Sequence, residues 1–479
     1  MRTPRLDLLI AICLSVLLRI GAGVYLGNHV EALPGTADQV SYHTLALRVL
    51  GGHGFSFSED WWPATAAGEP TAHWSYLYTL YLTAVYGLFG PHPLVARLIQ
   101  AVVVGVAHPL LAYKIADLIF GGSPTARIRQ VKDREGATQV PVPPVQEAPA
   151  LDRLGVPLLA ASVTAVYAYF VYYSGTLMTE PFYIAAVLLS IYLVLRLARA
   201  RTSRARRALS VGLGVSLAAA VLLRQVFLLM IPLLLVWLLA AARRASGSIR
   251  PAVGPALVSL CVCALAILPV TVFNYSRFDR FLLLNTNAGF AMFLSNHPFY
   301  GTRFVPASEM DGRYREMIPH ELRALSEADL DAELLKRGLR FVIDEPARYL
   351  RLSVSRVPLY FNFLPSQDSS SVSNVARTVS FGLFLPFMLL GLARPFLHGR
   401  ERGWVVRFGT LSAAVVLLYL FVLGYSLIHI LSWVQVRYRL PVDAVLVIFA
   451  ASGLHLVLQR TVGLASWLND SREGVLKNA

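Results

Sequence analysis

Ten long apolar runs constrain this chain more than any other feature of its sequence. Most approach the roughly 20 residues that cross the hydrocarbon core of a bilayer. They predict helices near residues 8–27, 95–120, 156–174, 181–198, 208–223, 226–242, 252–274, 379–397, 408–428 and 441–459. Composition agrees, because 56% of residues are hydrophobic and only 15% are charged, against about 25% charged in soluble proteins. The runs predict an all-α polytopic membrane protein with about 10–13 transmembrane helices.

The distribution of arginine predicts the orientation of these helices. The connection 196–207 contains six arginines and no acid, whereas the segment 28–94 contains one basic residue and five acids. Since cytoplasmic loops are enriched in Lys and Arg, we expect a cytoplasmic N-terminus and extracytoplasmic segments at 28–94 and 276–378. The chain has a net charge of +15, and its arginines lie between the apolar runs. This placement indicates contact with membrane lipids rather than with nucleic acid.

Three regions follow from this topology. They are a transmembrane catalytic module at 1–275, which includes the first outer loop 28–94, a small extracytoplasmic segment at 276–378 with a helical centre at 319–349, and C-terminal transmembrane helices with a short cytoplasmic tail at 379–479. The proline-rich stretch in the inner linker 121–154 is typical of an extended segment.

Interfacial helices are expected in the first outer loop. Thr36 and Gln39 fit a capping box at the start of a helix that reaches Leu50, and glycines at 51, 52 and 54 would end it. A second interfacial stretch, rich in Tyr and Trp, covers 73–89. Both would lie along the membrane surface.

Two acids at this surface are candidate catalytic groups. Asp38 would lie in the first turn of the first interfacial helix, where it either interacts with the helix dipole or acts as a general base. Glu180 lies between two apolar runs beside Pro181. It is either an interfacial acid or a group that faces substrate, since charge is costly in such surroundings.

Other polar residues near the same surface are candidate ligands of substrate. Arg437, Arg439 and, more weakly, Arg224 either extend to lipid headgroups or bind a phosphate with their guanidinium groups. His43 is either a helix-face residue or a substrate contact. Asn287 and Asn296 belong to a stretch whose amides suit either a turn-rich loop or the hydroxyls of a sugar.

Several short motifs resemble those of GT-C glycosyltransferases, in particular the bacterial branch related to lipid A aminoarabinose transferases and protein O-mannosyltransferases. In chain order they are Asp38…Tyr42-His43…Ala46…Leu50-Gly51…Gly54-Phe55-Ser56, then Leu88-Phe89-Gly90 with Ala96-Arg97-Leu98, then Met178-Thr179-Glu180-Pro181, and finally Arg437-Tyr438-Arg439-Leu440-Pro441. The resemblance covers most of 1–300 and 379–460. It rests on the order of the motifs together with the topology.

The resemblance implies the GT-C fold and a glycosyltransferase (hexosyl- or pentosyltransferase) of the bacterial inner membrane, with its active site on the extracytoplasmic side. It would move a sugar from a polyprenyl-phosphate donor to a hydroxyl of a glycan, lipid or protein acceptor by an inverting displacement. Asp38 would be the general base and Glu180 a second acid facing the sugar. Tyr42 belongs to the first motif and would contact substrate.

The chain departs from the family pattern at two places. Asp38-Gln39 stands where many members have an acidic pair, so a divalent metal is possible but not supported, and no cofactor is expected. Many members carry Lys-Pro before the second interfacial helix, whereas this chain reads Thr71-Ala72-His73-Trp74. His73 is the candidate substitute for that lysine.

Other functions remain open at this stage. A lipid-linked sugar transporter or flippase would show repeats and polar residues at the bilayer midplane, and few are found. An envelope polysaccharide ligase or polymerase would depend on arginines of the late outer loops and not on Asp38. A non-catalytic assembly protein is a further alternative.

Overall fold

The computed structural model describes residues 4–121, 155–305, 316–365, 371–397 and 412–477, apart from positions 34, 62 and 64, with side chains up to residue 461. These residues form helices and turns, and their only β-structure is two isolated bridges in the first outer loop, Ser56 with Pro70 and Trp61 with Thr65. Nearly all of the linker 121–154 lies outside the described residues.

Within that part of the chain, nine helices are long and apolar enough to cross a membrane. They are α1 (Pro4–Leu26), α4 (Pro93–Phe120), α8 (Glu180–Ala198), α9 (Ser203–Leu223), α10 (Ile231–Ser246) with the 3-10 helix η1 (Gln225–Met230), α11 (Arg250–Phe278), α16 (Leu383–Leu397) with α15 (Ser371–Arg377) and η6 (Thr378–Gly382), α17 (Ala413–Leu431), and α18 (Leu440–Lys477) with the 3-10 helix η9 (Val436–Arg439). The prediction of an all-α polytopic membrane protein is confirmed.

A tenth span is broken. The run at 156–174, expected as one helix, forms α6 (Val156–Val166) and α7 (Ala168–Ser174), which meet at an angle of 51°. The last carbonyls of α6 therefore lack partners within the helix. Arg19 of α1 is fully buried and donates to two of them, at 3.2 Å to Thr164 O and 3.0 Å to Ala165 O.

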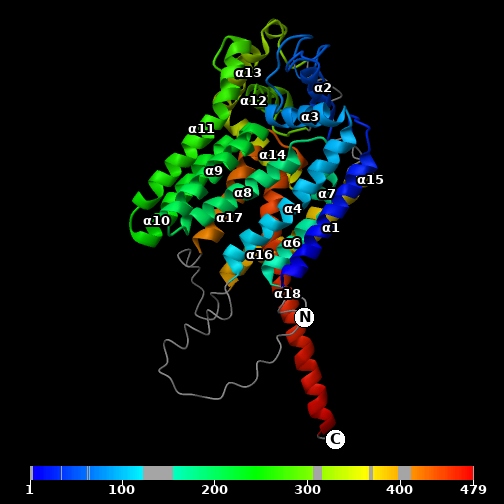
Figure 1. Cartoon of the computed structure of the whole chain (residues 1–479), viewed down its shortest axis with the longest axis vertical. Helices are drawn as coiled ribbons and strands as arrows, with labels where there is room; N and C mark the ends of the chain where they lie inside the picture. The colour runs from blue at the N-terminus through cyan, green and yellow to red at the C-terminus, as the bar shows by residue number, and fades with distance from the viewer. Residues whose placement is uncertain are drawn as a thin grey trace.

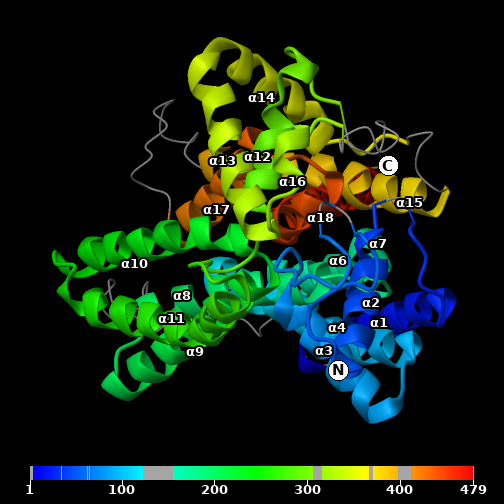
Figure 2. The same cartoon turned by 90° about the horizontal axis from the view of Figure 1, so that it is seen from above.

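α18 packs against α16, α6, α8, α17 and α4. Figures 1 and 2 show α18 beside α16 and α1 against α4, and α9 packs against both α8 and α11. Close approach of α16 and α18 requires glycine, because a Cβ at Gly391 or Gly453 would overlap the backbone of the other helix. The division of the chain at residues 275 and 378 stays a prediction.

One end of the bundle, which we call the loop end, carries the extramembrane helices, and α18 projects from the opposite end (Figure 1). The helices of the loop end are α2 (Asp38–Leu50), α3 (Tyr76–Phe89), α12 (Ala288–Asn296), α13 (Glu327–Asp344) and α14 (Pro346–Tyr360). α2 packs on α3, and α12 packs on α13. The expected interfacial helices and the helical centre of 319–349 are therefore present.

Candidate active site

Asp38 is the first residue of α2, and the packing of this helix fixes its position. α2 buries Tyr42 and Leu45, and its neighbour along the loop end is α3. It ends at Gly51, after which Gly52 adopts a positive φ of 79° that favours glycine. The Asp38 side chain is 26% exposed, so the helix presents a carboxylate at the surface of the loop end.

The prediction of a capping box at the start of this helix is wrong. The residue before α2 is Ala37, and no side chain caps the helix. Thr36 Oγ1 instead donates to Leu33 O at 3.4 Å, and Gln39 Nε2 donates to Glu31 O at 2.7 Å. Both side chains that were expected to cap the helix thus bind the preceding linker.

Arg437 forms an ion pair with Asp38, although the two residues lie near opposite ends of the sequence. Its Nη2 lies 2.7 Å from Asp38 Oδ2, and its side chain is only 8% exposed. The same guanidinium is held by Gln435 Oε1 at 2.6 Å and by Gly35 O at 3.4 Å. The first outer loop and η9 therefore meet at one ion pair.

Glu180 and Arg224 form a second ion pair beside the first. Glu180 Oε1 lies 2.5 Å from Arg224 Nη2, and Arg224 Nε donates to Thr179 Oγ1 at 3.0 Å. Arg437 Nε lies 3.8 Å from the same Glu180 oxygen, so the two pairs are linked. Glu180 is almost completely buried, whereas Asp38 is reachable from solvent.

Both arginines contact the ring of Tyr438. The guanidinium carbon of Arg224 lies 4.9 Å from its centroid, and that of Arg437 lies 5.3 Å from it, both within cation–π range. Tyr42, one turn after Asp38 on α2, packs edge-on against Trp74 and Tyr78, with ring centroids 5.5 and 5.0 Å apart. Burial, with a further contribution from the Asp38 carboxylate, raises the pKa of the Tyr42 hydroxyl.

Arg439 has a different set of partners from Arg437. It is fully buried and pairs with the fully buried Asp443 at 2.9 Å, while Tyr167 donates to the other Asp443 oxygen at 2.8 Å. Its Nη1 donates to Tyr360 O at 2.9 Å. The structure therefore does not bring Arg439 to Asp38, and its contacts join η9 to the break between α6 and α7.

The two candidate histidines of the first outer loop each bond a different neighbour. His43 bonds Tyr86 through Nδ1 at 2.8 Å, on a different face of α2 from Tyr42. His73 bonds Thr286 O through Nδ1 at 3.1 Å. Burial lowers the pKa of both rings, and the Glu327 carboxylate offsets part of that effect at His73. The role of His73 as a substitute for the lysine stays a prediction.

The candidate sugar-binding amides already have protein partners. Asn287 accepts from Gln225, the neighbour of Arg224, and donates to His73 O at 3.4 Å. Asn296 is buried, donates to Met292 O at 2.9 Å, and accepts from Arg356 at 2.9 Å. These contacts join loop segments to one another.

Two further residues of this region, Tyr438 and Glu327, were not among the predicted site residues. Tyr438 stood between two arginines and was not singled out, although its ring orders both Arg224 and Arg437. Glu327, in the first turn of α13, was not considered as a site residue. It accepts from Thr65 Oγ1 at 2.6 Å and from Ala72 N at 2.8 Å, and so joins α13 to the first outer loop.

Asp38 and Glu180 both lie near one arginine. Among the described residues no three His, Cys, Asp or Glu side chains come together as a metal would require. Asp38 and Glu180 both approach Arg437, so a guanidinium occupies the place between the two carboxylates.

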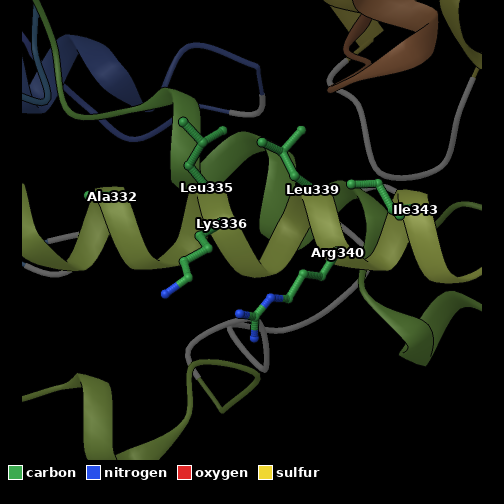
Figure 3. A pocket seen from close by; sticks show the side chains of 6 residues that line it. All are labelled: Ala332, Leu335, Lys336, Leu339, Arg340 and Ile343. Atoms are coloured by element: carbon green, nitrogen blue, oxygen red, sulfur yellow. The ribbon is translucent and has the colours of Figure 1, made fainter.

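A surface depression on α13 lies apart from these charges. Its lining residues are Ala332, Leu335, Lys336, Leu339, Arg340 and Ile343 (Figure 3). The figure shows the leucines on one side of α13, with Lys336 and Arg340 directed to the other. None of the paired acids and arginines contributes to it.

The fold and its loop end define the class of the protein: it is an all-α polytopic membrane protein with the GT-C fold that the sequence motifs implied. Among solved structures, the chain resembles the archaeal oligosaccharyltransferase AglB from Archaeoglobus fulgidus in complex with an inhibitory peptide and a dolichol-phosphate, with 17% identity, a TM-score of 0.56 and coverage of 97% of this chain. The apo form of that oligosaccharyltransferase gives the same values.

These likenesses establish the fold alone. The chain spans 51% of the length of AglB, that is, about half. ArnT from Cupriavidus metallidurans bound to undecaprenyl phosphate is 12% identical over 93% of this chain and 77% of its own, with a TM-score of 0.37, which is too low to support a common fold by itself. No protein-family model matches the sequence, and no curated protein matches it.

Proposed function

We propose that this protein transfers a sugar from a polyprenyl-phosphate donor to an acceptor hydroxyl at the extracytoplasmic face of a bacterial inner membrane. The observation that carries the proposal is the Asp38–Arg437 pair, linked to Glu180 and Arg224 at the loop end. Known structures with this fold include AglB in complex with a dolichol-phosphate. A lipid phosphate held at headgroup depth fits a site that lies where the spans meet the loop end.

Asp38 is the general base of the proposed reaction. It takes the proton of the acceptor hydroxyl while the acceptor oxygen bonds to the anomeric carbon. The bond from that carbon to the phosphate oxygen breaks, and its electron pair leaves with the polyprenyl phosphate. Such a displacement inverts the anomeric centre, and the phosphate needs positive charge rather than a proton as it leaves.

Arg437 and Arg224 supply that charge. Guanidinium groups bind phosphate oxygens with charge-assisted hydrogen bonds. Arg437 is paired with Asp38 when no donor is bound, so the donor phosphate competes with Asp38 for it and frees the carboxylate to act as a base. Glu180 is buried against Arg224, and in this proposal it holds the arginines in place rather than facing the sugar.

The proposed reaction needs no metal, since Arg437 lies where a cation would bridge Asp38 and Glu180. It also takes no step through His43, Asn296 or Arg439, whose polar atoms bind other parts of the fold. The identity of the sugar, whether hexose or pentose, and of the glycan, lipid or protein acceptor would be set by surfaces around these charges.

The test is turnover of radiolabelled polyprenyl-phosphate hexoses and pentoses by purified protein in lipid vesicles. Asp38→Asn keeps the size and polarity of the side chain but removes its basicity. It should lower turnover by about 10²–10⁴-fold without weakening donor binding. Glu59→Gln, at an exposed acid of the same loop, is the matched control and should behave as wild type.

Near-normal turnover by Asp38→Asn would remove Asp38 from the mechanism. That result, with loss of activity on substitution of Arg437 alone, would favour the ligase or polymerase alternative. Movement of intact lipid-linked sugar across the vesicle membrane without transfer would favour a flippase.

A further inference from the structure

Arg97 caps the end of the first span from a neighbouring helix. It belongs to the first turns of α4 and is fully buried. Its guanidinium donates to His29 O at 2.8 Å, to Leu26 O at 3.4 Å, and to Gly27 O. The last carbonyls of a helix lack intrahelical partners. Arg97 donates hydrogen bonds to such carbonyls at the point where α1 ends and the linker to α2 begins.

The same guanidinium reaches α2. Arg97 Nη2 donates to Gln39 Oε1 at 3.2 Å, and Gln39 Nε2 donates in turn to Glu31 O at 2.7 Å. Gln39 is 1% exposed. Since successive helical residues point about 100° apart, Gln39 is directed into the protein while its neighbour Asp38 meets Arg437.

We propose that Arg97 and Gln39 are positioning residues that hold the first turn of α2 so that Asp38 stays in register with Arg437; this rests on the proposed function. The need for them follows from the missing cap. A helix start usually gains a hydrogen bond from a capping side chain, but Ala37 provides none at α2. The contacts of Gln39 with α4 and with the linker replace that cap.

The amide at position 39 has a property that an acid lacks. It accepts from Arg97 with its oxygen and donates to Glu31 O with its nitrogen, whereas a carboxylate only accepts. Glutamate at this position would keep the contact with Arg97 and leave Glu31 O without its donor. The glutamine that departs from the acidic pair of the resembling family therefore has a structural task of its own here.

The experiment compares Arg97→Lys, Gln39→Leu and Gln39→Glu with a matched control, Arg356→Lys. Arg356 is also a fully buried arginine that donates to backbone carbonyls, those of Ser295 and of Ile430, the latter at 3.1 Å. It has no described contact with α2. All variants are purified in the full chain and reconstituted in the same vesicles.

Two readouts separate positioning from general stability. The first is kcat and donor KM for transfer, and the second is hydrogen exchange of the amides of residues 38–42. We expect Arg97→Lys and Gln39→Leu to lower kcat by about tenfold to 100-fold, since a displacement of about 1 Å can have that effect. Donor KM should change less than threefold, and exchange at 38–42 should become faster. Gln39→Glu should lie between these and wild type, and Arg356→Lys should leave both readouts unchanged.

The outcomes distinguish this inference from the proposed function. Wild-type protein that transfers no sugar and binds no undecaprenyl phosphate would refute the proposed function, while faster exchange in Gln39→Leu would still support the structural part of the pair. Active wild type with unchanged kcat and unchanged exchange in Gln39→Leu and Gln39→Glu would overturn the inference. An equal loss in Arg356→Lys would overturn it as well.

Discussion

Arg437 and Arg439 are two residues apart, but we expect substitution of Arg437 to weaken donor binding and substitution of Arg439 to destabilise the fold. Arg437→Gln removes a guanidinium whose partner Asp38 is 26% exposed. Glu180 keeps its contact with Arg224, so the cost in stability should be about 1 kcal/mol, as for partly hydrated pairs. Loss of one charged hydrogen bond to the donor phosphate, about 1.5–3 kcal/mol, corresponds to about 10- to 150-fold weaker donor binding.

Arg439→Gln should instead damage the fold. Both Arg439 and Asp443 are 0% exposed, and the substitution leaves a buried carboxylate with only the Tyr167 hydroxyl as partner. Removing one member of a buried ion pair costs about 3–5 kcal/mol. The double variant Arg439→Gln/Asp443→Asn removes both charges and should recover part of the loss.

The assay is the inactivation half-life at fixed temperature of purified variants in one detergent, measured beside a donor titration. Half-life is the suitable quantity because large membrane proteins often unfold irreversibly. The reasoning would be refuted if Arg439→Gln kept the wild-type half-life and lost donor affinity. It would equally fail if Arg437→Gln shortened the half-life as much as Arg439→Gln does.

Three further predictions concern topology, pH and packing. In a background without native cysteines, an impermeant thiol reagent on intact cells should label a cysteine at Glu69 and not one at Arg204; the reverse pattern would invert the orientation. Burial raises the pKa of Asp331 to about 6 from its ordinary 3.8, so its stabilisation is complete below about pH 4 and is lost as pH rises through 6. The inactivation half-life of the wild type should shorten from pH 5 to pH 7. An Asp331→Asn variant whose half-life depends on pH as strongly as that of the wild type would contradict this. Gly391→Ala would press on the α18 backbone and should cost about 1–3 kcal/mol, seen as a shorter half-life, whereas Gly254→Ala, with open space around it, should not.

The spans were predictable because a bilayer leaves an apolar run few alternatives to a helix. The break at Tyr167 was not, since the run at 156–174 contains no residue that must end a helix at that point. The carbonyls freed there are bound by Arg19, which lies in a different span. Such a break depends on a partner distant in sequence, and hydropathy carries no information about it.

Each charged residue of the site could be recognised in the sequence, but the ion pairs that these residues form could not be predicted from it. Each stands at the end of an apolar run, where charge is costly, but the sequence does not say which acid meets which arginine. Arg437 and Arg439 looked equivalent because both were expected at the same depth. A 3-10 helix has three residues per turn, so residues two apart point in different directions. Asp443, four residues after Arg439, was a signal that only this arginine has an acidic partner on the following helix.

The charge balance of the cluster explains why these four residues suit the proposed transfer. Two acids and two arginines leave it neutral when no donor is bound, and the donor phosphate adds one negative charge. During transfer Asp38 gains a proton and loses its charge, while the departing phosphate gains a negative charge, so the total stays the same. Arg437 lies beside the group that loses charge and, in this proposal, beside the group that gains it. In this proposal it therefore pairs the charge that builds up on the departing phosphate in a site of low polarity, where an unpaired charge costs most.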